Sequence, residues 1–402
     1  MQAFIVGGAV RDELLGIPVH DRDWVVVGAT PEDMLAKGFR PVGKDFPVFL
    51  HPDTHEEYAL ARTERKSAPG YRGFVFHTAP DVKLEDDLVR RDLTINAIAR
   101  AADGSLVDPF HGQQDLRNKV FRHVSDAFLE DPVRILRVAR FAARFPDFSV
   151  APDTNALMRK MVDGGEIVAL VPERVWQEVA RALMERQPSR MLAVLRACGA
   201  LARIMPQLDA LWGAPQPPAP QLEVDTGVPM MRVIDYAAAR GFELPVRFAA
   251  LMHDLGHERA GLALIEALCK RLKAPSDCRE LAIMTAREHG NISAAPTLPA
   301  ETLVTLFERD DAFRKPELFA RMLQAAECDA RGRGGDRAGA PYLQGPYLLA
   351  ALGAARAVNA GDVAQRCGED TKRIPLAVHA ARVAAVQASL RPIPAAPAAK
   401  AQ

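Results

Sequence analysis

The spacing of apolar and polar residues changes near residue 130, and this change divides the chain into two parts. Up to about residue 120, short apolar runs such as AFIV, DWVVV, PVFLH and EEYALAR alternate with glycine and proline turns, a pattern typical of strands. From Glu130 onward, segments such as EDPVRILRVARFAARF and PERVWQEVARALMER carry apolar residues three or four positions apart, which predicts amphipathic helices. We therefore expect an α+β fold, with an N-terminal mixed-sheet head followed by a mostly helical body and a helical tail.

Proline-rich and low-complexity stretches give the expected domain boundaries. A chain of 402 residues is too long for one core. The stretch GAPQPPAPQLEVDTG cannot continue a helix, and RPIPAAPAAKAQ has no amphipathic pattern. The segment Arg331 to Gly339 is expected to be a mobile loop. The expected domains are a head (1–125), a helical body (126–212), a proline-rich linker (213–224), a helical tail (225–389) and a disordered end (390–402).

Charge and cysteine content narrow the class of protein. Lys plus Arg and Asp plus Glu each number 51, so a polyanionic partner has to be held by a local basic patch. The five cysteines are scattered and contain no C-x-x-C pair, which argues against a disulfide framework and a zinc ribbon. No apolar run approaches the roughly 18 residues of a membrane span. We expect a cytoplasmic protein with no membrane partner.

Two aspartates precede the most apolar strand. In HDRDWVVVG, Asp21 and Asp23 are two residues apart, so a strand would point both carboxylates to the same side. Such a pair repels itself unless a cation lies between, and hard oxygen ligands suit Mg²⁺, which borrows further oxygens from a bound phosphate. The alternative is a hydrated turn that leads into a strand.

The segment before the aspartates predicts a phosphate site. FIVGGAVRDELLG predicts a strand, a Gly7-Gly8 turn and a short helix ending at Gly16, with Arg11 in its first turn. Backbone N–H groups of the two glycines are expected to face a phosphate. The spacing fits neither G-x-G-x-x-G nor a Gly-Lys-Ser/Thr loop. A glycine turn followed by an Asp-x-Asp strand instead provides what a nucleotidyltransferase needs, namely sites for phosphates and for a metal ion.

The segment from Glu130 to Phe145 combines a packing face with a basic face. Asp131 before Pro132 predicts a helix start. Four arginines then fall within about 120° of one another on a helical wheel, beside an apolar face. The arginines are Arg134, Arg137, Arg140 and Arg144, and the apolar face holds Ile135, Val138, Ala142 and Phe145. A binding face beside a buried face is therefore expected.

These motifs, in order, resemble those of the bacterial class II tRNA nucleotidyltransferases, the CCA-adding enzymes. The resemblance rests on GGAVRDELLG…DRDWVV, RRDLTINAIA (90–99), DPFHGQQDL (108–116) and EDPVRILRVARF (130–141), and covers the first two hundred residues. It implies that Mg²⁺ lies on Asp21 and Asp23, and that Asp131 and Arg134 read the base. The remaining nucleotide-binding residues it implies are Gly8, Arg11, Arg91 and Asp92, the last for the ribose, with Arg137 and Arg140 on the triphosphate.

Each assignment has a plainer alternative. Asp131 can cap the helix, a role that can coexist with base reading. The arginines from Arg134 onward can form a solvated basic face. The charged residues RRD at the start of RRDLTINAIA, a stretch compatible with a helix, can form a solvated charge cluster. Glu57 in HEEYALAR is a possible third carboxylate, and PERVWQEVARAL, with Glu173 in its first turn, is expected to support the nucleotide pocket structurally.

The resemblance implies that the chain adds C, C and A to the 3′ end of tRNA without a template. The partners would be the tRNA 3′ end, CTP and ATP, with no obligate protein partner. A poly(A) polymerase of the same family is an alternative, although those enzymes usually carry a long basic C-terminal extension, whereas this chain ends in AAPAAKAQ. A non-catalytic RNA-binding protein is a further alternative, and it leaves the metal and triphosphate residues unexplained.

The tail contains the His253-Asp254 dipeptide of HD phosphohydrolases, which many relatives in this family carry. The position of the family's upstream histidine corresponds to Pro229, and Asp329 matches the distal aspartate. The loop after the dipeptide is also short, and for His257 within it capping or packing is favoured over metal binding. We therefore expect a degenerate HD-like tail. An additional HD-type phosphohydrolase activity is the alternative.

Overall fold

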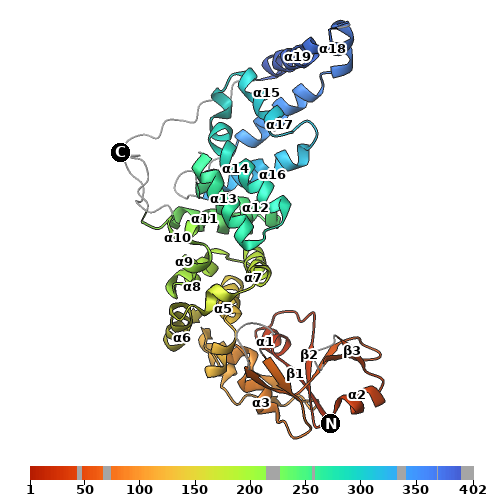
Figure 1. The fold of residues 1–402 in the computed structure, drawn as a ribbon, viewed down its shortest axis with the longest axis vertical. Coiled ribbons are helices and arrows are strands. Elements are labelled where there is room, and N and C mark those ends of the chain that lie inside the picture. The colour runs from red at the N-terminus through yellow and green to blue at the C-terminus, as the bar shows by residue number, and fades with distance from the viewer. Residues whose placement is uncertain are drawn as a thin grey trace. The chain divides into compact units, whose positions relative to one another are not determined.

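The computed structural model describes residues 1–42, 48–66, 74–213, 227–255, 259–332, 341–368 and 370–390 (Figure 1). The chain forms two compact units. The first unit comprises Met1–Glu178 and Arg190–Ile204, and the second comprises Val179–Ser189 and Met205–Gln402. The expected linker and the disordered end lie almost entirely outside the described residues, as does most of the expected mobile loop; the helix α16 extends two residues into that loop. The domain boundaries therefore stay predictions.

The first unit contains a mixed seven-stranded sheet and the first nine helices, except that residues 179–184 and Ser189, at the ends of two of these helices, belong to the second unit. The sheet has the order β3-β4-β5-β2-β1-β8-β9, in which β2 and β5 are parallel and the other neighbours antiparallel. Its strands are β1 (Gln2–Val6), β2 (Asp23–Val27), β3 (Arg40–Val42), β4 (Val48–Leu50), β5 (Glu57–Leu60), β8 (Ala99–Arg100) and β9 (Leu106–Val107). Two small sheets pair β6 (Thr63–Lys66) with β7 (Phe74–His77) and β10 (Val120–Phe121) with β11 (Ser149–Val150).

The helices of this part follow the expected pattern of short helices and then longer amphipathic ones. They are α1 (Gly8–Leu14), α2 (Pro31–Ala36), α3 (Leu84–Val89), α4 (Gly112–Asn118), α5 (Val133–Arg144), α6 (Pro152–Asp163), α7 (Pro172–Met184), α8 (Ser189–Ala197) and α9 (Ala200–Ile204). The expected apolar face of α5 is buried: Ile135, Val138 and Ala142 are fully buried and Phe145 nearly so.

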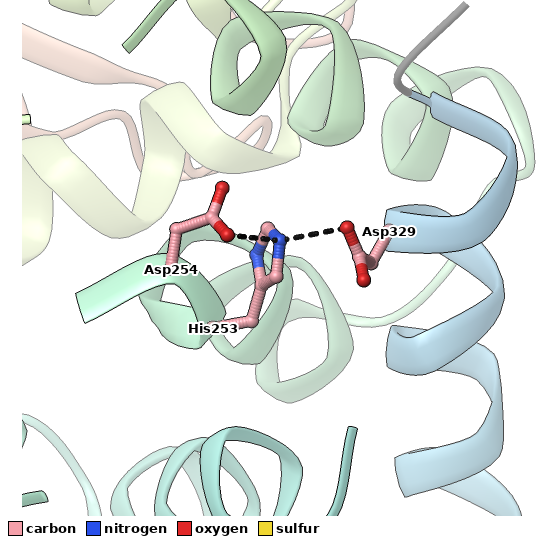
Figure 2. A group of neighbouring side chains, drawn as sticks. All are labelled: His253, Asp254 and Asp329. Atoms are coloured by element: carbon pink, nitrogen blue, oxygen red, sulfur yellow. Dashed lines mark hydrogen bonds and ion pairs between the residues drawn. The ribbon is translucent and has the colours of Figure 1, made fainter. Parts of the chain in front are cut away.

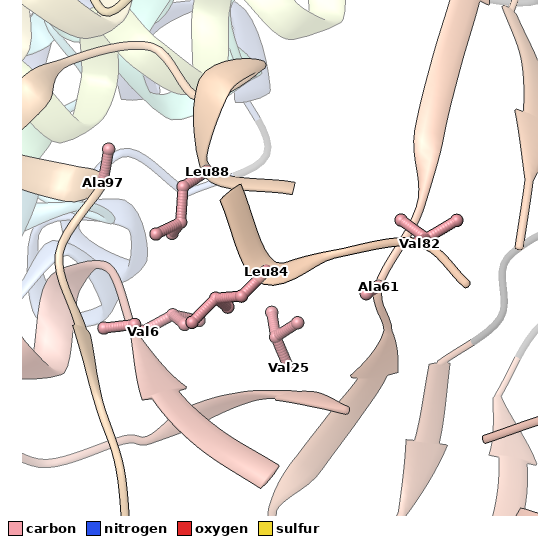
Figure 3. Close-up of a cluster of buried hydrophobic side chains, with 8 residues drawn as sticks. Val6, Val25, Ala61, Val82, Leu84, Leu88 and Ala97 are labelled. Atoms are coloured by element: carbon pink, nitrogen blue, oxygen red, sulfur yellow. The ribbon is translucent and has the colours of Figure 1, made fainter. Parts of the chain in front are cut away.

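The central strand β2 is apolar because both of its faces are covered. Successive side chains of a strand point to opposite faces. Val25 packs in one cluster with Val6, Leu84 and Leu88, the last two from α3, as Figure 3 shows. Val26 packs on the other face with Met34 of α2. Burial on both faces fixes the register of β2, and so fixes the position of Asp23 at its start.

The second unit is entirely helical in its described part, as the sequence predicted for this region. Its helices are α10 (Pro206–Asp209), α11 (Gly227–Ala239), α12 (Leu244–Met252), α13 (Arg259–Leu272), α14 (Ser276–Ala294), α15 (Ala300–Arg309), α16 (Pro316–Gly332), α17 (Gln344–Arg356), α18 (Ala360–Arg366) and α19 (Ile374–Ser389). Val233, Ala237, Ala250 and Cys328 bring α11, α12 and α16 into one buried cluster. Among the helices described here, none has the length and apolar composition needed to span a membrane.

Candidate active site

A cavity of about 650 Å³ in the first unit gathers most of the predicted site. Nine of its nineteen lining residues are arginines and four are acidic, so the cavity carries an excess of positive charge suited to a polyanion such as a triphosphate. Of the ten predicted site residues, nine line it: Gly8, Arg11, Asp23, Arg91, Asp92, Asp131, Arg134, Arg137 and Arg140. Asp21 is not among the lining residues.

The aspartate pair lies at the edge of the sheet next to the glycine turn. Asp23 begins β2 and is opposite Val6, the last residue of β1 before Gly7. Asp21 precedes the strand, so the expectation that both aspartates belong to it was wrong by two residues. Both are exposed, and neither carboxylate makes a hydrogen bond or an ion pair within the part of the chain that the structure describes. Two exposed carboxylates with free oxygens fit a divalent cation.

A third carboxylate lies beside the pair. Glu57 on β5 is the register partner of Asp23 on the parallel strand β2 and is exposed. It therefore lies where a third carboxylate of the site would have to be. The intervening Arg22 forms an ion pair with Glu56, with 3.7 Å between Nη1 and Oε1. The chain therefore offers up to three acidic side chains at one end of adjacent strands.

The Gly7-Gly8 turn needs glycine for two reasons. Gly7 has φ +71°, and a Cβ at this residue would lie 2.9 Å from Nη1 of Arg91. The expectation that both glycine N–H groups are free for a phosphate was wrong for Gly7, because its N–H donates to the carbonyl of Ile98 at 3.2 Å. The turn thus lets the Arg91 guanidinium lie directly against the backbone.

Replacing Gly7 with alanine is expected to raise KM for a nucleoside triphosphate about tenfold, because the added Cβ would displace the Arg91 guanidinium from the position predicted to bind the triphosphate. The positive φ also costs about 1–2 kcal/mol of stability. Gly16→Ala is the matched control, since Gly16 has φ +69° but no atom within 4 Å of the added Cβ. Steady-state kinetics and thermal melting separate the two effects. Equal KM values for the two variants would contradict this role of Gly7.

A buried aspartate of α3 orients two arginines of the cavity. Asp87 accepts hydrogen bonds from Nη2 of Arg90 at 2.6 Å and Nη2 of Arg91 at 3.1 Å. Burial alone would raise the pKa of Asp87, but the charges of the two arginines outweigh it and hold the pKa below its usual value. Sequence reasoning missed Asp87. Its spacing of three and four residues from these arginines on a helical pattern is the signal that could have found it.

Asp92 is buried in the wall of the cavity rather than in a solvated charge cluster. Its carboxylate accepts from the backbone N–H of Leu93 at 2.8 Å, from Nδ2 of Asn96 at 2.9 Å and from Nε of Arg137 at 2.7 Å. Burial opposes ionisation, yet these partners hold the pKa of Asp92 far below its usual value. The segment is not helical as its composition suggested: it forms a 3-10 turn over Thr94–Asn96, which these hydrogen bonds stabilise.

The arginines of α5 are each held from behind. Arg134 donates to the carbonyls of Ala127 at 2.9 Å and Arg90 at 2.6 Å. Arg140 is buried and pairs with Glu178 of α7 at 2.6 Å, which rules out a simple solvated basic face for this residue. Arginines anchored in this way lose little further freedom when they bind phosphate.

Arg11 is more enclosed than its predicted position in the first helical turn suggested. It is 3% exposed and donates to Asp12 at 2.8 Å and to Asn96 at 2.6 Å. Its guanidinium also lies 5.0 Å from the ring centroid of Phe141. Burial lowers the pKa of Arg11 although the Asp12 carboxylate opposes that change. Only part of this side chain can therefore face a ligand.

Asp131 occupies the wall of the cavity where α5 begins. Its Oδ1 accepts from the backbone N–H of Val133, the first residue of α5, at 3.1 Å, but the N-cap of α5 is Pro132, so the expected capping position was wrong by one residue. Both its oxygens also accept from Arg174 of α7. Sequence reasoning gave this helix a structural role only, but Arg174, Gln177 and Glu178 line the cavity. The helical spacing of Arg174 and Glu178, four residues apart, was the available signal.

The second unit holds the HD residues. The ring of His253 is fully buried; its Nδ1 lies 2.7 Å from the carbonyl of Ala250 and its Nε2 lies 3.0 Å from Asp329 and 3.2 Å from Asp254 (Figure 2). Among the described residues this is the one group of three or more whose potential metal-ligand atoms all lie within 4.8 Å. Pro229, in α11, offers no ligand, and His257 lies outside the described residues.

A larger cavity, of about 960 Å³, lies in the second unit and contains none of the predicted site residues. Its lining mixes five basic and four acidic residues, so it lacks the charge excess of the smaller cavity. One of the acids, Asp310, is buried, and burial together with neighbouring Glu288 raises its pKa to about 6. Size therefore does not identify the active site, and the smaller cavity has the matching chemistry.

The fold and the first cavity define a nucleotidyltransferase. The chain matches two family profiles, the "Poly A polymerase head domain" over residues 3–122 and the "Probable RNA and SrmB- binding site of polymerase A" over residues 147–211. A Multifunctional CCA protein of Herminiimonas arsenicoxydans is 62% identical over 98% of this chain and 99% of its own length. One of Burkholderia multivorans is 63% identical over 97% and 99%. The chain therefore belongs to the family of Multifunctional CCA proteins, the bacterial CCA-adding nucleotidyltransferases.

A solved structure has the same fold. The Thermotoga maritima CCA-adding enzyme complexed with tRNA is 21% identical, with a TM-score of 0.66, and the match covers 97% of this chain and 88% of that one. The predicted family and the predicted fold of a mixed-sheet head with a helical body are confirmed. Membership also implies a reaction that uses a divalent metal ion.

Proposed function

We propose that this chain adds C, C and A to the 3′ end of tRNA without a nucleic-acid template, with CTP and ATP as substrates. The observation that carries this proposal is one cavity of about 650 Å³ that combines an exposed aspartate, a glycine turn, nine arginines and an Asp–Arg pair at a helix start. A metal site, a triphosphate site and a base-reading site are the three parts such a reaction needs. The five cysteines are free thiols, which supports a cytoplasmic location.

Asp21 and Asp23 would hold Mg²⁺, which when bound favours ionisation of the attacking 3′-hydroxyl and neutralises charge on the reacting phosphoryl group. Arg91, fixed by Asp87, would bind the triphosphate beside the glycine turn. Arg137, fixed by Asp92, would bind it from the other side, while Asp92 keeps one acceptor position for the ribose. These groups are already oriented, so binding spends little free energy on ordering them.

Asp131 and Arg134 would select the base. A carboxylate accepts from the exocyclic amine that cytosine and adenine both carry, whereas uracil and guanine present a carbonyl oxygen at that place. Arg134, whose guanidinium has five N–H donors, would donate to the ring acceptors beside the amine. Protein side chains would thereby replace the template, and the helices after about residue 145 would hold tRNA by its shape and phosphates.

A single assay tests the proposed reaction against its alternatives. Purified protein is given tRNA that lacks its last three nucleotides, together with Mg²⁺, CTP and ATP, and the products are sequenced. Products that end in CCA support the proposal. A long A tail would identify a poly(A) polymerase instead, and binding of tRNA without any extension would identify a non-catalytic RNA-binding protein.

A second candidate activity, metal-dependent phosphohydrolysis in the second unit, is favoured by the His253, Asp254 and Asp329 group alone. When Nδ1–H donates to the carbonyl of Ala250, Nε2 presents a lone pair toward two carboxylates, an arrangement that requires a proton or a metal ion at that point. The residues present could supply three ligands. Pro229 leaves the position of the upstream histidine without one, which supports a degenerate HD-like tail.

Hydrolysis of a cyclic phosphate in the presence of a divalent transition-metal ion distinguishes an active phosphohydrolase in the tail from a degenerate HD-like tail. An active site in the second unit would retain this hydrolysis in Asp21→Ala and lose it in Asp254→Asn. A degenerate tail predicts no hydrolysis above background in either variant or in the wild type, with CCA addition unaffected by Asp254→Asn.

A further inference from the structure

Arg174 forms a bidentate hydrogen bond with the carboxylate of Asp131. Its Nη1 lies 3.3 Å from Oδ1 and its Nη2 lies 2.8 Å from Oδ2. The two residues are 43 positions apart and belong to different segments of the first unit, because Arg174 is in the first turn of α7 whereas Asp131 lies two residues before the start of α5. A guanidinium that meets both oxygens of a carboxylate fixes its plane as well as its position.

The remaining hydrogen bond leaves Asp131 with one open direction. An ionised carboxylate has about four acceptor positions. Oδ1 accepts from Arg174 and from the backbone N–H of Val133 at 3.1 Å, and Oδ2 accepts from Arg174. One acceptor position on Oδ2 is thus left, on a residue that lines the cavity. A single donor, such as an exocyclic amine, can be read there.

We propose that Arg174 is a positioning residue for base selection, which acts by aiming the open acceptor position of Asp131 at the incoming base; this inference rests on the proposed function. Without the guanidinium, rotation of the carboxylate about its soft terminal torsion spreads the acceptor over many directions. Discrimination of C and A from U and G then weakens, because water can occupy the freed positions and a base carbonyl is no longer opposed by a fixed oxygen. Lysine cannot replace the fork.

The test compares R174K with R181K, a control on an exposed residue of the same helix. kcat and KM are measured for CTP and for UTP on tRNA that lacks its terminal nucleotides. For R174K we expect kcat/KM for CTP to fall about 10- to 100-fold, as for loss of one charged hydrogen bond, and that for UTP to change less than about threefold. The CTP/UTP selectivity ratio therefore falls at least about threefold, and R181K keeps the wild-type ratio.

If Arg174 had only a structural role, R174K would lower kcat/KM for CTP and for UTP equally. An unchanged CTP/UTP selectivity ratio in R174K therefore overturns the proposal. Thermal melting checks that each variant is folded; if R174K does not fold, R174Q is measured in the same comparison.

A second arm repeats the substitution in D131N: if Arg174 acts through Asp131, R174K changes the ratio less than threefold there, whereas additive losses overturn the proposal. A wild type that adds CCA while R174K keeps its selectivity refutes this inference alone. A wild type that adds nothing refutes the proposed function and this inference with it.

Discussion

Replacing Asp21 or Asp23 with alanine should lower the rate of nucleotide incorporation by about three orders of magnitude. The two carboxylates would supply the charge and the oxygen ligands for a divalent cation, whose stabilisation of the transition state is worth several kcal/mol, and about 4 kcal/mol corresponds to that loss of rate. Both side chains are exposed at the start of β2, so their removal leaves the buried faces of the sheet intact. Incorporation of labelled CTP into tRNA that lacks CCA is the measurement.

Arg22→Ala is the matched control for both variants. Arg22 lies between the two aspartates in the chain but pairs with Glu56, so its loss should change the rate by less than about fivefold, the range expected for an exposed pair worth at most about 1 kcal/mol. Binding of tRNA should persist in all three variants. Normal incorporation by either aspartate variant would remove that residue from the metal site.

Asp92→Ala should be the second most damaging change, because it acts on stability and on nucleotide binding together. The buried carboxylate accepts three hydrogen bonds and pairs with Arg137 at 2.7 Å. Loss of the buried acceptor of a charged hydrogen bond costs about 1.5–3 kcal/mol, less than for a fully buried pair because the Arg137 side chain is 37% exposed, and a released Arg137 would no longer face the proposed triphosphate position. Denaturant unfolding should show the loss of stability, and KM for both CTP and ATP should rise at least tenfold.

The pH dependence of stability distinguishes this carboxylate from others. Its pKa is lower in the folded than in the unfolded chain, so its contribution is present above the unfolded pKa near 4 and is lost as the pH falls toward the folded value. Asp92→Asn should flatten the fall in stability below pH 4. Asp163→Asn is the control, because Asp163 is an exposed residue at the end of α6; equal acid profiles for the two variants would contradict this role of Asp92.

The parts of the site that follow from local spacing could be predicted from the sequence. The Gly7-Gly8 turn, the aspartate pair and the arginines of α5 all depend on residues within one strand or one helix. The burial of Val25 and Val26 on opposite faces likewise follows from a run of apolar residues in a central strand.

Most partners that orient these groups could not be predicted, because they come from distant parts of the chain; Asp87, within four residues of the arginines that it orients, is the exception. Glu178 meets Arg140 and Arg174 meets Asp131 only once α7 packs beside α5. Hydrogen bonds also overrode the expected preference around Asp92, where a stretch compatible with an α-helix became a 3-10 turn; the carboxylate of Asp92 accepts locally from Leu93 and Asn96 and from the distant Arg137. The enclosure of Arg11 by Asp12, Asn96 and Phe141 is of the same kind.

A crystal structure with Mn²⁺ and a non-hydrolysable CTP analogue would show directly whether Asp21 and Asp23 hold a divalent cation beside the nucleotide, because anomalous scattering locates the ion without ambiguity. We expect an anomalous peak from an ion bound by carboxylate oxygens of Asp21 and Asp23. We also expect the triphosphate between the glycine turn and Arg137, and the cytosine amine at Oδ2 of Asp131. A peak away from this aspartate pair, or a nucleotide bound outside the arginine-lined cavity, would contradict these expectations.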